Sequence, residues 1–571
     1  MIKYKFPLVF TIFIFAIILF SIIIRVQDLG YSNFQGDEVN TVDFLYQMED
    51  GKVIDYLFSQ KRGPTQYIIN LINVGIFGYH NEFWIRLPYV LFGILAIYTF
   101  YRLSKEIFGK NAALLSALFI SINGLFIAFS RITQYQSVMY SLIPIGVLLF
   151  IIALKKMSVR HMAVAGLLMS VMLITHYDTL SVLPFFLVSF VGKFYRDGNY
   201  SRDSMLKYLK LAGIFFLFFI IPPLFFYIPF SMHQEFGNRT SGYLEDRLFG
   251  GGFMPRTWLT IYLLSMYKPM WFIGVIYLLA ISSALFHLKS AKNFILKQID
   301  DRFVRLGLLS MVILNIVGTM MSLTYFKPRL STLVVVATSL AICALLTFSK
   351  NISVKYASLM CWFLGAYSAY LFLFKDPRTH VYVVFMPAIL LAGYTAYKLY
   401  SSVNSMRLKY IVLGLLGLVV LYITGLNYSI FVNKNPEYPW FDRYYLGKLV
   451  FDMPRVRYKK IDGVFGFNNW RGWEKVAEYV DNGCLIGNID SNEKDSVTYF
   501  YLRKHQLRQD FLSYVPGLAD NYIYIEGPHS WEYESRALPN TYDLVATISS
   551  SDTPVTYIYS KNYNPECFKT D

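Results

Sequence analysis

Residues 6–26 read FPLVFTIFIFAIILFSIIIRV, an apolar run of the length that an α-helix needs to cross a membrane. Lys3 and Lys5 precede this run. A cleaved signal peptide has a shorter apolar core and a small-residue cleavage site, and neither is present here. We therefore expect a retained first transmembrane helix with its N-terminus in the cytoplasm. This helix determines on which side of the membrane each later loop lies.

Apolar runs of similar length recur along the chain. The protein has 571 residues, of which 55% are hydrophobic and 16% charged, against roughly 25% charged in soluble domains. Lys and Arg gather in the loops assigned to the cytoplasmic side, as the positive-inside rule requires. The net charge of +16 therefore does not indicate nucleic-acid binding. We predict an all-α, multi-pass protein of the plasma (inner) membrane with spans at 6–26, 83–101, 111–130, 137–154, 161–175, 178–192, 211–230, 268–288, 306–326, 331–348, 356–374, 380–398 and 410–431.

The composition changes at about residue 432, which divides the chain into a membrane domain, 1–431, and a tail, 432–571. An odd number of spans places the tail outside the cytoplasm. After a proline-containing linker, residues 470–480 have helical spacing, and 522–525 and 555–559 are strand-like. We predict a small extracytoplasmic α/β domain.

The four cysteines do not form a metal cluster. Cys343 and Cys361 fall in apolar spans and are expected to be packing residues. Cys484 and Cys567 fall in the tail and could pair, because an extracytoplasmic compartment allows disulfides. The sequence also shows no useful internal repeat, which argues against transporters built from inverted halves.

Two adjacent carboxylates, Asp37 and Glu38, stand in the first outer loop, 27–82, within the stretch FQGDEVN. Helical spacing follows over 37–48 and again over 65–77, which predicts two short helices along the membrane surface. Adjacent helical side chains point about 100° apart, so one carboxylate could face a cavity while the other orients it. An N-cap role for Asp37 is compatible with this.

Cations in the outer loops are candidates for holding a phosphate. Lys61 and Arg62 precede the second surface helix, and Arg131 lies between the third and fourth spans with Gln134 close behind it. Arginine and amide groups suit the recognition of phosphate or sugar. The alternative is that these cations contact lipid head groups as ordinary interfacial residues.

Further polar residues mark two later outer turns. His176 and Asp178 interrupt a long apolar stretch, and Arg378 and His380 begin a span that continues through Tyr382. We predict that Arg378 binds phosphate and that the other four contact substrate. The His176–Asp178 pair could ligate a metal, but two ligands are few and a capped turn is the simpler interpretation. We therefore assign no metal site.

These residues and the stretches GYHNE, 78–82, and FWIRLP, 83–88, resemble the GT-C membrane glycosyltransferases. The resemblance is to the branch of protein O-mannosyltransferases and lipid A aminoarabinose transferases (glycosyltransferase family 39), and it is strongest over 30–140. It implies that Asp37 is the general base and that Arg62 and Arg131 belong to the lipid-phosphate site. The chain has Gln136 where mannosyltransferases have an aspartate, so the cofactor stays unknown and a divalent cation stays open.

The resemblance implies an inverting glycosyltransferase that takes a sugar from a polyprenyl phosphate. The acceptor would be a hydroxyl of a protein or glycolipid at the outer membrane face. The other expected partners are membrane lipids, and we expect no binding to nucleic acid. A transporter or lipid flippase without transferase activity is the alternative. It would place charges in mid-span, whereas the strong polar groups here gather at the outer ends of the spans.

Overall fold

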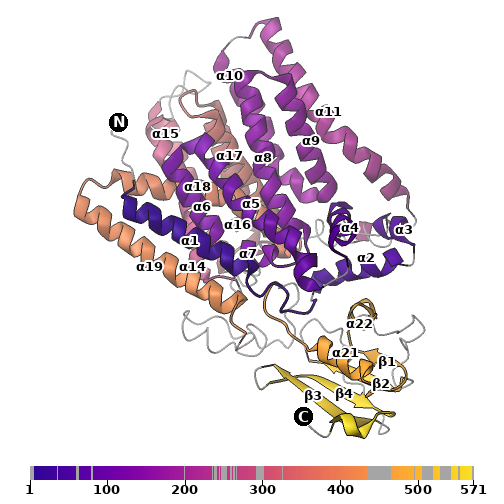
Figure 1. The fold of residues 1–571 in the computed structure, drawn as a ribbon. Helices are drawn as coiled ribbons and strands as arrows, with labels where there is room; N and C mark the ends of the chain where they lie inside the picture. Colours follow the sequence, from indigo (N-terminus) through magenta and orange to yellow (C-terminus); the bar gives the residue numbers. More distant parts are fainter. Residues whose placement is uncertain are drawn as a thin grey trace.

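A computed structural model gives the structure of the chain. Most of it is a bundle of long apolar helices, with a small sheet against one end (Figure 1). We call this end of the bundle the domain end. The structure describes residues 6–34, 36–49, 51–58, 63–78, 81–198, 200–233, 236, 241–242, 245, 254–257, 260, 264, 267–290, 301–324, 326–434, 465–493, 495–503, 519–526, 542–550 and 553–568.

In the described part of the chain, eleven helices are long and apolar enough to cross a membrane. The bent pair α6 and α7 makes a twelfth span if it is counted as one, and the 17-residue α9 coincides with the remaining predicted span. The predicted all-α multi-pass fold is confirmed. The bundle helices are α1 (Leu8–Val26), α5 (Glu82–Phe108), α6 (Lys110–Ser121), α7 (Gly124–Ser130), α8 (Tyr135–Lys156), α9 (Val159–Thr175), η2 (Tyr177–Val182), α10 (Leu183–Asp197), α11 (Arg202–Met232), α14 (Met270–Ser282), η4 (Ser283–Ser290), α15 (Asp301–Leu323), α16 (Pro328–Phe348), α17 (Val354–Ser368), η5 (Ala369–Leu373), η6 (Arg378–Val381), α18 (Tyr382–Ser402) and α19 (Met406–Phe431).

The third predicted span is broken by a bend of 64° between α6 and α7. Asn123 caps α7, since its Oδ1 accepts a hydrogen bond from the backbone N–H of Leu125 at 3.2 Å. Gly124 follows, and a Cβ there would lie 2.0 Å from the carbonyl oxygen of Tyr267. The bend therefore requires a capping side chain and a residue without a side chain in direct succession.

Short helices between α1 and α5 build the domain end. They are η1 (Gly36–Glu38), α2 (Val39–Glu49), α3 (Val53–Phe58) and α4 (Thr65–Phe77). Helices α2 and α4 coincide with the two helices predicted from the sequence. An apolar cluster that includes Val42, Phe44 and Tyr67 joins them. The sequence of residues 257–267 also predicts a surface helix, and this segment falls largely outside the described residues.

Within the described residues, the C-terminal domain contains a four-stranded sheet in the order β1-β2-β4-β3, in which the β1–β2 pair is parallel and the other two pairs are antiparallel. Alternate residues of β2 are buried, and Ile523 and Ile525 pack with Trp473 in the core of the domain. The predicted small α/β domain is confirmed. Its elements are α21 (Trp473–Asp481), β1 (Ile489–Ser491), α22 (Asp495–Leu502), β2 (Asn521–Ile525), β3 (Asp543–Ser550), β4 (Thr553–Ser560) and η8 (Pro565–Phe568).

One covalent bond stabilises this domain internally, and hydrogen bonds attach it to the bundle. Within it, Cys484 and Cys567 form a disulfide with a Cα–Cα distance of 5.7 Å. Against the bundle, the Tyr501 hydroxyl donates to Glu82 Oε1 at 2.5 Å, and the Asn33 N–H donates to the Asn469 carbonyl at 3.0 Å. The C-terminal domain is therefore packed on the segment that leads from α1 into η1.

Candidate active site

The neighbouring carboxylates Asp37 and Glu38 have opposite surroundings. Both belong to the short η1 helix, but Asp37 is exposed and Glu38 is fully buried. The sequence predicts such a division, because adjacent helical positions face different directions. Asp37 is thus the one of the two that can meet a substrate from solution.

Arg86 of α5 holds Glu38 in place. Its Nε and Nη2 atoms donate to the two carboxylate oxygens of Glu38, each at 2.8 Å, in a bidentate pair. Its Nη1 donates to the carbonyls of Leu29 and Ser32 at 2.9 and 2.8 Å. Both side chains are almost completely buried. A buried pair with its hydrogen bonds satisfied fixes the backbone of η1, and with it the position of Asp37.

A second set of buried hydrogen bonds ties α2 and α4 to the turn before α8. The Gln66 Nε2 donates to Thr41 Oγ1 at 3.1 Å and to the Thr133 carbonyl at 2.8 Å. The Thr133 N–H in turn donates to Glu38 Oε1 at 3.1 Å. The Asn70 side chain joins through Thr41 and Tyr89. The exposed carboxylate of Asp37 therefore stands on a rigid base.

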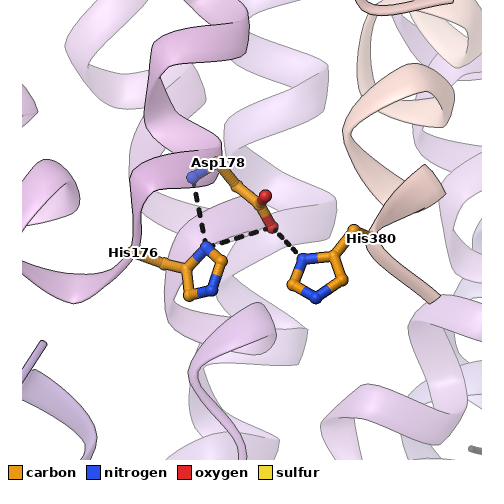
Figure 2. A group of neighbouring side chains, drawn as sticks. All are labelled: His176, Asp178 and His380. Atoms are coloured by element: carbon orange, nitrogen blue, oxygen red, sulfur yellow. Dashed lines mark hydrogen bonds and ion pairs between the residues drawn. The ribbon is translucent and has the colours of Figure 1, made fainter. Parts of the chain in front are cut away.

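A second charged cluster lies where η2 and η6 meet, and Figure 2 shows its three side chains. Nδ1 of His380 and Nδ1 of His176 lie 2.8 and 3.3 Å from the same oxygen of Asp178, Oδ2. The other carboxylate oxygen, Oδ1, accepts a hydrogen bond from Tyr370 at 2.8 Å. His176 also caps η2, because its Nδ1 accepts from the Asp178 backbone N–H at 3.1 Å. The capped turn predicted here is thus present.

The turn before α8 connects the two clusters. Thr133 contacts Glu38, and the ring of Tyr135 stacks on His176 with centroids 4.3 Å apart. Gln134 lies between them and is fully buried, and neither polar atom of its amide is hydrogen-bonded within the described residues. A buried amide without partners costs about 1–3 kcal/mol, so this group is suited to hydrogen-bond a polar substrate.

The predicted phosphate-binding cations have different surroundings. Arg131 is buried, and its guanidinium donates to the Ile24 and Gln27 carbonyls at 2.6 and 2.8 Å, where it caps the end of α1. Arg378 is exposed and paired with Asp376 at 2.9 Å. Lys61 and Arg62 lie outside the described residues. Phosphate binding by these cations stays a prediction, and Arg131 has a structural task of its own.

The residue after Arg62 is nevertheless placed. Gly63 packs against the end of α9, where an added Cβ would lie 1.4 Å from the Ile174 carbonyl oxygen. Ile174 is two residues before His176. Gly63 therefore lies against the bundle beside the histidine cluster. The last predicted substrate contact, Tyr382, is fully buried and lies edge-to-face against Phe129.

Sequence reasoning gave no role to two residues of these clusters. Arg86 lies within the stretch FWIRLP, and a single arginine inside an apolar span was the available signal. Tyr370 carries no such signal, because aromatic residues are common in spans. Its contact with Asp178 joins segments 192 residues apart and needs the folded chain.

The fold is that of a multi-pass membrane protein with a small α/β domain at one end. Residues 63–226 match the model of the dolichyl-phosphate-mannose-protein mannosyltransferase family. The resemblance indicated by the sequence motifs is thereby confirmed. The match includes Arg86, Thr133, His176 and Asp178.

Solved structures with a related arrangement include ArnT from Cupriavidus metallidurans in the apo state, at 13% identity and a TM-score of 0.44, covering 96% of this chain and 97% of that one. The oligosaccharyltransferase AglB from Archaeoglobus fulgidus, in complex with an inhibitory peptide and a dolichol-phosphate, is 13% identical with a TM-score of 0.41. That alignment covers 86% of this chain and only 59% of AglB. These likenesses are too distant to add to the family match. A comparison with curated proteins gave no match.

Proposed function

We propose that the protein is an inverting glycosyltransferase that moves a sugar from a polyprenyl-phosphate donor to a hydroxyl of a protein or glycolipid. The observation that carries this proposal is the difference in exposure between Asp37 and Glu38. Glu38 forms a buried ion pair with Arg86, which fixes its position. Asp37 is exposed on the same short helix. A positioned, exposed carboxylate at one end of the membrane domain is suited to act as a general base.

The chemistry needs one base and cations for the leaving group. Asp37 takes the proton of the acceptor hydroxyl, and the oxygen attacks the anomeric carbon of the donor sugar from the side opposite the phosphate. The bond from that carbon to the phosphate oxygen breaks, and the phosphate leaves with the electron pair as an anion. Cations stabilise this developing charge. Arg378, Lys61 and Arg62 are the proposed cations, and the buried amide of Gln134 is the proposed contact to the sugar.

An apolar cavity supports a lipid carrier. It has a volume of about 80 Å³ and is lined mainly by apolar side chains of α14, α15, α17 and α18. Val381 lines this cavity, and the preceding residue is His380 of the charged cluster. A donor with a charged head and an isoprenoid tail matches this neighbourhood of polar and apolar surfaces. The part of the tail next to the phosphate would enter the cavity while the phosphate stays among the cations.

We further propose that the domain end faces away from the cytoplasm. The disulfide between Cys484 and Cys567 supports this orientation, because such bonds persist in oxidising compartments. The excess of Lys and Arg in the loops assigned to the cytoplasm supports it independently. The donor would then be used from the outer leaflet of the plasma membrane.

The experiment compares wild type with Asp37→Asn in membranes of a strain that lacks the chromosomal copy, where natural acceptors are present. Transfer is followed from a panel of radiolabelled polyprenyl-phosphate sugars. We expect Asp37→Asn to lower turnover by about 10²–10⁴-fold, the usual contribution of a general base. Asp55→Asn is the control, because Asp55 is an exposed carboxylate on the neighbouring α3.

Equal turnover in wild type and Asp37→Asn would show that Asp37 is not the base. Movement of the donor lipid across the membrane without any glycosylated product would favour the flippase alternative. The amount of folded protein is measured in each membrane preparation, so that a loss of turnover is not a loss of enzyme.

A further inference from the structure

Two imidazoles and one carboxylate converge where η2 and η6 meet. His176 and Asp178 flank one residue at the start of η2, while His380 comes from η6, 202 residues after Asp178. One ligand atom from each of the three residues lies within 4.8 Å of the other two. Figure 2 shows both rings directing a nitrogen at the same carboxylate oxygen. The sequence alone offered only two of these three groups in one place.

We propose that His176, Asp178 and His380 bind a divalent transition-metal ion of the Zn²⁺ type. Two neutral imidazoles with one carboxylate are a ligand set that zinc uses where a fourth position is left to water or substrate. In tetrahedral geometry, bonds of about 2.0–2.1 Å separate the ligand atoms by about 3.3–3.4 Å. The observed separations are 3.3 Å from His176 Nδ1 to Asp178 Oδ2 and 2.8 Å from His380 Nδ1. Small shifts of the rings bring both into range.

The surroundings of His176 favour a cation between the ring and the carboxylate. The Asp178 backbone N–H donates to Nδ1 of His176, so this nitrogen acts as an acceptor. The same nitrogen lies 3.3 Å from Oδ2, which is also an acceptor. Two acceptors facing each other in a buried site repel one another, and a positive ion between them removes this repulsion. Coordination by Nδ1 uses the lone pair that accepts the Asp178 N–H, so the metal takes the place of this hydrogen bond. An imidazole that accepts at Nδ1 is in the neutral form that binds metals.

The residues around the three ligands resemble the outer shell of a metal site. Tyr370 donates to Oδ1 of Asp178, which orients the carboxylate so that Oδ2 faces the two rings. The Tyr135 ring stacks on His176 with an angle of 7° between the planes and restricts the ring's rotation. Such outer contacts set the direction of metal ligands and typically contribute 10–100-fold in affinity.

Of the three ligands, His380 is the most exposed. The side chains of His176 and Asp178 are 2% and 1% exposed, whereas His380 is 13% exposed. A fourth ligand, either water or an anionic oxygen, therefore reaches the ion from the side of His380. The metal site does not depend on the proposed function, because it follows from the ligand set and its geometry.

The test uses the full-length protein, purified in detergent without a polyhistidine tag. The protein is stripped with a chelator, dialysed, loaded with Zn²⁺ or Co²⁺, and freed of unbound metal. We expect about one Zn²⁺ per chain by mass spectrometry and the visible absorption bands of four- or five-coordinate Co²⁺. His380→Ala and Asp178→Asn should each abolish stoichiometric binding. The control is His161→Ala, since His161 lies at the start of α9 and contacts Ser158 instead.

A finer variant separates metal binding from folding. Tyr370→Phe leaves all three ligands in place and removes only the hydrogen bond to Asp178. We expect it to stay folded and to bind Zn²⁺ about 10–100-fold more weakly than wild type. Folded wild-type protein that binds neither ion stoichiometrically would overturn the proposal, and so would binding that survives in both ligand variants. The cluster would then be held together by protons alone.

Discussion

Glu38 and Asp178 are both buried carboxylates at the domain end, but they have different partners. Glu38 is bound by the guanidinium of Arg86, and Asp178 lies between two imidazoles. A guanidinium is always charged and its planar fork matches a carboxylate, so the Glu38 pair has one state. An imidazole can lose its proton or exchange it for a metal ion. The first pair is therefore suited to fix a backbone and the second to respond to what binds.

The neighbourhoods of the two carboxylates support the same distinction. Arg86 donates to both oxygens of Glu38 and to three backbone carbonyls between α1 and η1. Its hydrogen bonds therefore hold this segment of the backbone in place. Around Asp178, one oxygen is shared by two ring nitrogens, one of which also accepts an N–H. A carboxylate paired with a permanent cation and a carboxylate with exchangeable partners thus lie on either side of Gln134.

The largest effect is expected from breaking the fixed pair. Arg86→Met leaves the Glu38 carboxylate buried without its counter-charge, which typically costs about 3–5 kcal/mol of folding free energy. The free energy of unfolding in detergent, followed by circular dichroism against denaturant, measures it. Arg102→Met is the matched control, because Arg102 is exposed on the same helix, α5, and should change stability by about 0.5 kcal/mol or less. Equal effects of the two variants would show that the Glu38 pair does not fix the fold.

A smaller effect is expected at the exchangeable site. In chelator-treated protein, Asp178→Asn removes the charge but keeps an oxygen that can accept from Tyr370, and it leaves imidazoles that can be neutral. We expect a loss of about 1–3 kcal/mol, the cost of imperfectly paired buried polar groups. The same unfolding measurement applies. A loss as large as that of Arg86→Met would mean that both imidazoles carry fixed positive charges, and the distinction between the two sites would fail.

The regular elements near these sites could be predicted from the sequence. Apolar runs and helical spacing predict the bundle, α2 and α4, and alternation predicts β2 and β4, because burial on one face determines those patterns. Local geometry also predicts that Asp37 and Glu38 point in different directions, but it does not predict which of the two is exposed. The break between α6 and α7 does not, because it depends on the close approach of Gly124 to Tyr267.

The pairings within the site could not be predicted. Arg86 meets Glu38 across 48 residues, and His380 meets Asp178 across 202, so each depends on which helices become neighbours. Arg131 shows the same limit. Its place in a loop suggests an available cation, but the end of α1 packs beside it and the α1 carbonyls take up its guanidinium. Local sequence shows which groups are present and tertiary packing selects their partners.

Glu493, half-buried in the C-terminal domain, extends the comparison to a carboxyl whose pKa is governed by desolvation rather than by a charged partner. Burial raises its pKa to about 7, and the charge of Arg471 lowers it only in part. Because the pKa is higher in the folded than in the unfolded state, the folded protein holds more protons between about pH 4.5 and 7. The free energy of unfolding should therefore fall as the pH rises through this window. Above it, the loss is complete.

Glu493→Gln removes this titration, so the stability of wild type relative to the variant should decline from pH 4.5 to 7 and be level on either side. The measurement is urea unfolding of the C-terminal domain in the full-length protein, followed by fluorescence across that pH range. Glu478→Gln, at an exposed carboxyl of α21, is the control for the chemical change itself. A difference that grows as the pH rises would mean that the Glu493 carboxylate is stabilised by a cation, as Glu38 is. Glu493 and Glu38 would then both be carboxylates held by a cation, and the contrast between them would fail.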